Sequence, residues 1–279
     1  ASRLFNASNI TASMLTGLDR LGEEKKLPPY MFSWCLALDT IDLSGTDISH
    51  AEGLFYNTNI QTVTGLDNLF KTKKLPIYMF AFCKHLFSIN LSGLDISESS
   101  NLFTGSNITQ AKLLGLNQLG GERKLPPYMF NECKELTSLD LGNLDISDAT
   151  GMFRYSNISE VTRLSDKTLP SWMFSQCQKI TSIDLTGANI SQAFTLFSSS
   201  TIKNVVGLSG TLPSDVLSIF FNCINLELVD LSNYNDLFTP NYNLKGLFKK
   251  TNVNKENIQH ITNRELNETE INFLLGKSE

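Results

Sequence analysis

Two short hydrophobic segments alternate along the chain, and each returns at nearly constant spacing. The first segment begins with Leu-Pro, continues through an aromatic segment and a cysteine, and ends in an L-x-x-L-x-L pattern. Its copies begin at Leu27, Leu75, Leu125, Leu169 and Leu212. The second segment carries a Leu-Phe or Met-Phe pair followed by Asn-Ile or a related pair. Two kinds of coil, each of about 24 residues, therefore alternate, which is the signature of a solenoid.

The L-x-x-L-x-L pattern predicts a short strand in every coil of the first kind. In Ile41-Asp42-Leu43 the apolar side chains point inward and the polar one points outward, because successive side chains of a strand alternate between its faces. Strands of successive coils would stack in parallel and form one face of the solenoid. The expected fold class is α/β: a leucine-rich-repeat solenoid with parallel short strands on one face, short helical or 3₁₀ segments on the other, and a C-terminal helical cap.

The Leu-Pro-Pro-Tyr-Met-Phe segment at residues 27–32 suits the return path of the coil. Proline is tolerated in the first turn of a helix, so Tyr30, Met31 and Phe32 are expected to begin a short helical or 3₁₀ segment. Its Met or Phe would fill the core, and the Leu-Phe pair of the second kind of coil would do the same. Packing then accounts for most of the 18 Phe residues.

The repeat pattern weakens after Tyr234, and the last 25 residues are polar and charged with apolar positions at roughly helical spacing. We therefore expect residues 1–254 to form a solenoid of alternating coils and residues 255–279 to form a C-terminal capping segment. The chain begins inside a coil of the second kind. This indicates an upstream segment, or another cover for Leu4 and Phe5.

The five cysteines occupy the same place in successive copies of the first segment, at Cys35, Cys83, Cys133, Cys177 and Cys223. Equivalent positions two coils apart lie about 10 Å from each other. A disulfide requires Cα atoms within about 7 Å, so the sequence predicts buried free thiols. The same distance argues against a shared metal ion.

Charge and motifs exclude several functions. A net charge of −5 and a pI near 5.3 argue against a nucleic-acid partner. The chain has no apolar run of about 18 residues, so membrane insertion is not expected. Its three histidines lie outside any nucleophile, zinc or phosphate motif. We therefore expect neither an enzyme nor a cofactor.

Polar residues at the outward strand positions are the candidate interaction site. They comprise Asp42, Asn90, Asp140, Asp184 and Asp230, with Thr40, Ser88, Ser138 and Ser182 beside them. A solvated face without function is the alternative explanation. A second ladder follows five residues on, at Asp47, Asp95, Asp145, Asn189 and Asn235. These side chains are expected to bond backbone amides of a turn, and a bound cation is the alternative.

The segment from Met129 to Ser147 reads Met-Phe-x-x-Cys-x-x-Leu-x-x-Leu-Asp-Leu-x-x-x-Asp-x-Ser. It resembles the leucine-rich repeats of bacterial surface proteins of the BspA-like type, although those proteins usually repeat one kind of coil. The resemblance implies a cell-surface or secreted location and binding of a protein or glycan partner, with a role in adhesion and virulence. The alternatives are an intracellular adaptor, a secreted effector domain, or a passive spacer.

Overall fold

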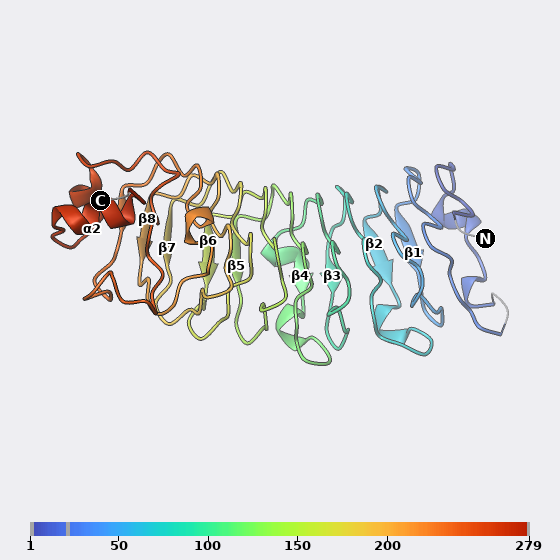
Figure 1. Cartoon of the computed structure of the whole chain (residues 1–279). Coiled ribbons are helices and arrows are strands. Elements are labelled where there is room, and N and C mark those ends of the chain that lie inside the picture. Colours follow the sequence, from blue (N-terminus) through green and yellow to red (C-terminus); the bar gives the residue numbers. More distant parts are fainter. Residues whose placement is uncertain (1–2, 21–22, 278–279) are drawn as a thin grey trace. The chain divides into compact units, whose positions relative to one another are not determined.

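The computed structural model of the chain describes residues 3–20 and 23–277. These residues form two compact units. The first unit contains residues 1–136 and 143–148, and the second contains residues 137–142 and 149–279. Each unit is a parallel β-solenoid built from strands of only two or three residues (Figure 1).

Every strand pair is parallel and joins the first kind of coil to the second. In the first unit, β1 (Thr40–Asp42) pairs with β2 (Thr62–Thr64), and β3 (Ile89–Asn90) pairs with β4 (Leu113–Leu114). In the second unit, the pairs are β5 (Ser138–Asp140) with β6 (Glu160–Thr162), and β7 (Ser182–Asp184) with β8 (Asn204–Val206), which also pairs with β9 (Leu228–Val229). The predicted solenoid of parallel strands is confirmed. The strands of the second kind of coil were not predicted, because an alternation such as Thr62-Val63-Thr64 is too short to stand out.

The return path at residues 29–34 is a series of hydrogen-bonded turns. Every second N–H of this segment donates to a carbonyl oxygen of the next coil: Tyr30 to Glu52, Phe32 to Leu54, and Trp34 to Tyr56, at 2.7, 3.1 and 2.9 Å. Tyr30 and Trp34 have φ angles of 54° and 62°. The expected helical start at Tyr30–Phe32 was therefore wrong, because a helix would direct these N–H groups to its own carbonyls.

The short 3₁₀ segments mostly lie elsewhere in the coils. They span Ala12–Met14, Leu18–Arg20, Leu66–Asn68, Gln110–Lys112, Leu116–Gln118 and Val216–Ser218. The last of these belongs to the return path of the copy that begins at Leu212. The others follow the Asn-Ile or related pair of the second kind of coil.

Stacked phenylalanines form the centre of the core in each unit. In the first unit, ring centroids 5.7–6.1 Å apart connect Phe5, Phe32, Phe55, Phe80, Phe103 and Phe130. In the second unit, separations of 5.6–6.3 Å connect Phe153, Phe174, Phe197, Phe220 and Phe248. From Phe32 onward these rings are fully buried. The predicted core role of the Met-Phe and Leu-Phe pairs is confirmed.

All five cysteines are free and buried, as predicted. The thiol of Cys83 donates to the carbonyl oxygen of Phe55 at 3.0 Å, and the other cysteines bond the core Phe of the preceding coil in the same way. Burial raises the pKa of Cys83 to about 11, which keeps this thiol protonated. These residues are therefore small apolar core residues with one weak donor.

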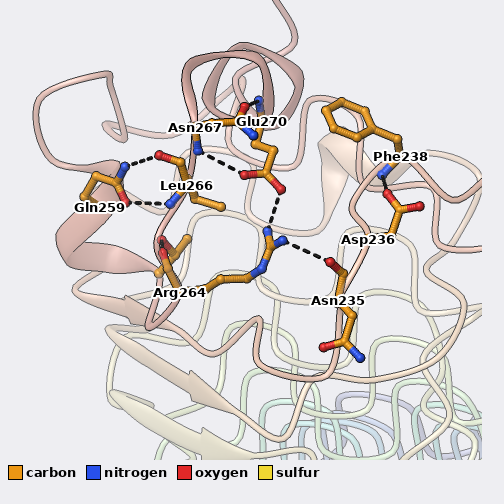
Figure 2. Close-up of polar contacts among 9 residues, drawn as sticks. Asn235, Asp236, Phe238, Gln259, Arg264, Leu266, Asn267 and Glu270 are labelled. Atoms are coloured by element: carbon orange, nitrogen blue, oxygen red, sulfur yellow. Dashed lines mark hydrogen bonds and ion pairs between the residues drawn. The ribbon is translucent and has the colours of Figure 1, made fainter.

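Two short helices close the C-terminal end of the second unit: α1 (Ile258–Ile261) and α2 (Glu268–Leu274). Asn267 and Glu270 form a reciprocal capping box at the start of α2, and Arg264 forms an ion pair with Glu270 at 2.9 Å (Figure 2). Ile258 and Leu274 are fully buried. The C-terminal helical cap is confirmed, and the domain boundary after residue 254 stays a prediction.

Candidate functional site

The predicted site residues lie on the outward side of the strands in both units. Thr40 and Asp42 flank buried Ile41 in β1, and Ser182 and Asp184 flank buried Ile183 in β7. The equivalent outward positions are Ser88 and Asn90 at β3, Ser138 and Asp140 in β5, and Asp230 directly after β9. We call these positions, with the outward residues of the paired strands, the strand face. The alternation predicted from the sequence is present throughout it.

The predicted acidic or amide residue at each strand of the first kind of coil also holds the turn that follows its strand. Oδ1 of Asp42 accepts hydrogen bonds from the N–H of Ser44 at 2.9 Å and from its hydroxyl at 2.7 Å. The same backbone bond joins Asn90 to Ser92, Asp140 to Gly142, Asp184 to Thr186, and Asp230 to Ser232, at 2.8–3.0 Å. These residues thus have a structural role that the pattern of the strand alone did not reveal.

Hydrogen bonding also shifts the acidity of this position. The pKa of Asp42 lies below its ordinary value because Ser44 donates to the carboxylate. Thr186 lowers the pKa of Asp184 in the same way, and Ser232 lowers that of Asp230. These carboxylates therefore stay ionised at neutral pH.

The acidic positions do not form a continuous stripe, because each strand of the first kind is paired with a strand of the second. Thr64 lies beside Asp42, Leu114 beside Asn90, Thr162 beside Asp140, and Val206 beside Asp184. Arg163 forms an ion pair with Asp140 at 3.1 Å, which offsets one of the charges. The strand face is consequently a mixed surface of small polar, acidic and apolar side chains.

Side chains of the second ladder accept hydrogen bonds from backbone amides of a turn, as the sequence predicted. Oδ1 of Asp47 accepts from the N–H of Ser49 at 3.0 Å, and the copies at Asp95, Asp145 and Asn189 make the same bond at 2.9–3.0 Å. Asn235 was the wrong residue for the last copy. Its neighbour Asp236 accepts from Phe238 at 2.9 Å instead, because the corner there is one residue longer (Figure 2).

Two hollows open on the strand face, one in each unit. A hollow of about 580 Å³ in the first unit is lined by Thr40, Asp42, Ser44 and Thr64, among others. A hollow of about 530 Å³ in the second unit is lined by Ser182, Asp184, Glu160 and Arg163, among others. Four of the predicted site residues therefore line recesses of the surface.

An exposed aromatic residue just before a strand of this face escaped the sequence analysis. Phe87 lies just before β3 with 77% of its surface exposed, and Leu114 in β4, the strand paired with β3, is 50% exposed. The residues at the position of Phe87 in the other copies of the first kind of coil are polar: Asp39, Thr137, Thr181 and Glu227. Alignment of the copies position by position would have identified Phe87 as a departure from the repeat.

The described part of the chain contains no group of three or more His, Cys, Asp or Glu side chains placed to hold a metal ion. Among the same residues, no helix has the length and apolarity needed to cross a bilayer.

The model of the BspA type leucine rich repeat region matches residues 15–122 and 121–227, with six copies of the repeat. These two matches together span most of the chain. No curated protein matches the sequence, and no solved structure does.

Proposed function

We propose that this chain, which belongs to the BspA-type leucine-rich repeat family, is a non-catalytic interaction domain of a cell-surface or secreted protein. Its partner is another protein, bound along the strand face. Repeat proteins gain extended binding surfaces as a direct consequence of stacking their coils. Adhesion to host or neighbouring-cell proteins is the corresponding role.

The observation that carries the proposal is the hollowed, mixed character of the strand face. In each unit a recess of more than 500 Å³ is lined by small hydroxyl side chains and an aspartate. Protein interfaces combine such polar groups with a few apolar anchors. Thr40 and Ser182 are exposed and leave room for a partner's side chains.

Phe87, which borders this face just before β3, is its anchor in the first unit. Its ring is 77% exposed, so a partner would remove a large apolar area from water. Aromatic residues dominate the binding energy of protein interfaces, and the residues around them mainly exclude water. Leu114 adds a second apolar contact on the same face.

The test places bulk and charge on the strand face without removing the turn-holding aspartates. We expect the double substitution Thr40→Arg/Ser182→Arg to abolish capture of the partner from an extracellular-matrix extract, measured by quantitative mass spectrometry. Neither side chain makes a hydrogen bond with another described residue, so the fold is expected to persist. The captured protein is then purified, and its affinities for the unmodified chain and for the double variant are compared to give the loss of affinity.

The matched control is His50→Arg/Gln192→Arg, which adds the same charge at equivalent exposed corners of the two units. It should capture the same protein as the unmodified chain. If the chain is a passive spacer, the strand-face variant and the corner variant will capture the same proteins in the same amounts. That result would refute the proposal.

A further inference from the structure

A second recess lies on the return-path side of the first unit, away from the strands. Its volume is about 440 Å³, and its aromatic lining comes from Tyr30, Trp34, Tyr56 and Tyr78. Arg3 and Asn6 contribute polar groups to the same recess. No aliphatic side chain lines it, which distinguishes it from a recess suited to lipid or to apolar peptide side chains.

Tyr56 is the centre of this aromatic cluster. Its ring meets those of Tyr30 and Tyr78 edge-on, with centroids 6.3 and 6.4 Å away, and it meets Phe82 at 5.3 Å. Trp34 is the most open member, with 51% of its surface exposed. The rings are therefore held in place by one another while Trp34 remains accessible.

The fold of the coil does not require an aromatic side chain at Tyr56 or at Trp34. Tyr56 follows the buried Leu-Phe pair, and the residues at that place in other coils are Asn6, Thr104, Arg154 and Ser198. Trp34 precedes the buried cysteine, where other copies have Phe82, Glu132, Gln176 and Asn222. Polar or charged residues occupy most of these positions in the other coils, so the aromatic cluster is a feature added to the repeat.

The cluster also carries hydrogen-bond donors that the fold does not use. The hydroxyl of Tyr30 donates to Glu52 at 2.8 Å. The hydroxyls of Tyr56 and Tyr78 and the indole N–H of Trp34 make no hydrogen bond with another described residue. A ligand with many hydroxyl groups could satisfy all three.

These features together select a sugar over charged ligands. An aromatic ring presents a negative face, which attracts the slightly positive C–H groups on one side of a pyranose. Arg3 lies over the ring of Tyr30, with its guanidinium carbon 5.6 Å from the centroid, and Glu52 accepts from the hydroxyl of the same ring, so these opposite charges leave no net attraction for a cationic ligand. A single arginine is too little positive charge to favour an anionic ligand.

We propose that Trp34, Tyr56 and Tyr78 form a binding site for a neutral oligosaccharide, separate from the strand face. In the second unit, a comparable pair of exposed aromatic residues is not available to a sugar. There the guanidinium of Arg154 lies over both Tyr155 and Trp172, 4.8 and 5.0 Å from the ring centroids. Those ring faces are occupied by the chain's own side chain.

The chain has two tryptophans, so Trp172→Phe leaves Trp34 as the only tryptophan, whose emission is recorded selectively. This variant is screened against immobilised neutral glucans, mannans, galactans and N-acetylhexosamine polymers, and soluble oligosaccharides from each hit are titrated while Trp34 emission is recorded. We expect at least one class to shift the emission. In the same background, Tyr56→Thr should weaken binding about tenfold or more, because a central ring is lost.

Tyr128→Asn is the control, because Tyr128 holds the same repeat position as Tyr30 and Tyr78 but does not line the recess, and Asn tolerates the φ of 56° found there. It should bind as the unmodified site does. The proposal is overturned if no polymer class shifts Trp34 emission, if both substitutions weaken binding equally, or if choline binds and the oligosaccharides do not. Equal thermal midpoints of the two variants ensure that lost binding is not lost folding.

Discussion

Asp42, Asp184 and Asp230 each accept hydrogen bonds from the residue two positions on, which holds the turn after the strand. Their outward position alone made them look like residues available for a partner. At the residue scale, the strand face is therefore better probed through its neighbours Thr40 and Ser182, which hold no turn.

The lowered pKa values of these three aspartates predict a pH dependence of stability. A carboxylate whose pKa is lower in the folded than in the unfolded chain stabilises the fold fully above the unfolded value, near 3.9. That contribution is lost as the pH falls below this value and through the folded pKa. We expect the unfolding free energy, measured by denaturant titration, to be lower at pH 3 than at pH 5.5.

Replacing all three aspartates with Asn supplies the control. Asn90 shows that an amide oxygen can hold the same turn, since it accepts from Ser92 at 3.0 Å. The triple variant should fold and should lose less stability between pH 5.5 and pH 3. An unchanged pH dependence would mean that other carboxylates dominate.

Gly65 illustrates how tightly neighbouring coils meet at this turn. It has a φ of +77°, and a Cβ there would lie 2.3 Å from the backbone nitrogen of Ser44 and 2.5 Å from Oδ1 of Asp42. Gly93 has a similar φ of +70° with open space around it. Gly93→Ala should cost about 1–2 kcal/mol from backbone strain alone.

We expect Gly65→Ala to cost clearly more than Gly93→Ala, because it adds the clash to the same strain. Thermal unfolding of the two variants gives the comparison. Similar losses would show that the turn at Ser44 can move away without penalty.

At the scale of the element, the phenylalanine stack is the main stabilising structure. Phe55 is fully buried between Phe32 and Phe80, with ring centroids 6.0 and 5.7 Å away. Replacement by alanine leaves a cavity in a core that cannot close, since the backbone on both sides is hydrogen-bonded to neighbouring coils. Phe55→Ala should therefore lower the unfolding free energy by about 3–5 kcal/mol.

Phe87→Ala is the control for this prediction, because the same side chain is removed from an exposed position. It should change the unfolding free energy by less than about 0.5 kcal/mol. Denaturant titration followed by circular dichroism measures both. A comparable loss at Phe87 would contradict the exposed position of this side chain.

The sequence was sufficient to predict the elements of the first kind of coil, because buried positions repeat with little change. It did not predict the turns at Tyr30 and Trp34. Their left-handed backbone follows from hydrogen bonds to the next coil, and no local propensity signals it. The strands of the second kind of coil, which place Thr64 beside Asp42 and Leu114 beside Asn90, were also missing from the prediction.

At the scale of the whole molecule, stability is expected to be a sum of local terms. In a solenoid each coil contacts only its neighbours, so a defect acts most strongly on the coils beside it. The chain offers a direct way to observe this, because Trp34 belongs to the first unit and Trp172 to the second. Each tryptophan alone reports on its own unit.

Ile60 and Ile258 provide matched defects, since both are fully buried isoleucines and lie in different units. Each Ile→Ala change should cost about 2–5 kcal/mol locally. Ile60→Ala should lower the unfolding midpoint reported by Trp34 in the Trp172→Phe background more than the midpoint reported by Trp172 in the Trp34→Phe background. Ile258→Ala, in the C-terminal cap, should do the opposite. If both reporters shifted equally for either substitution, the chain would unfold as one cooperative block, and the local description of its stability would be wrong.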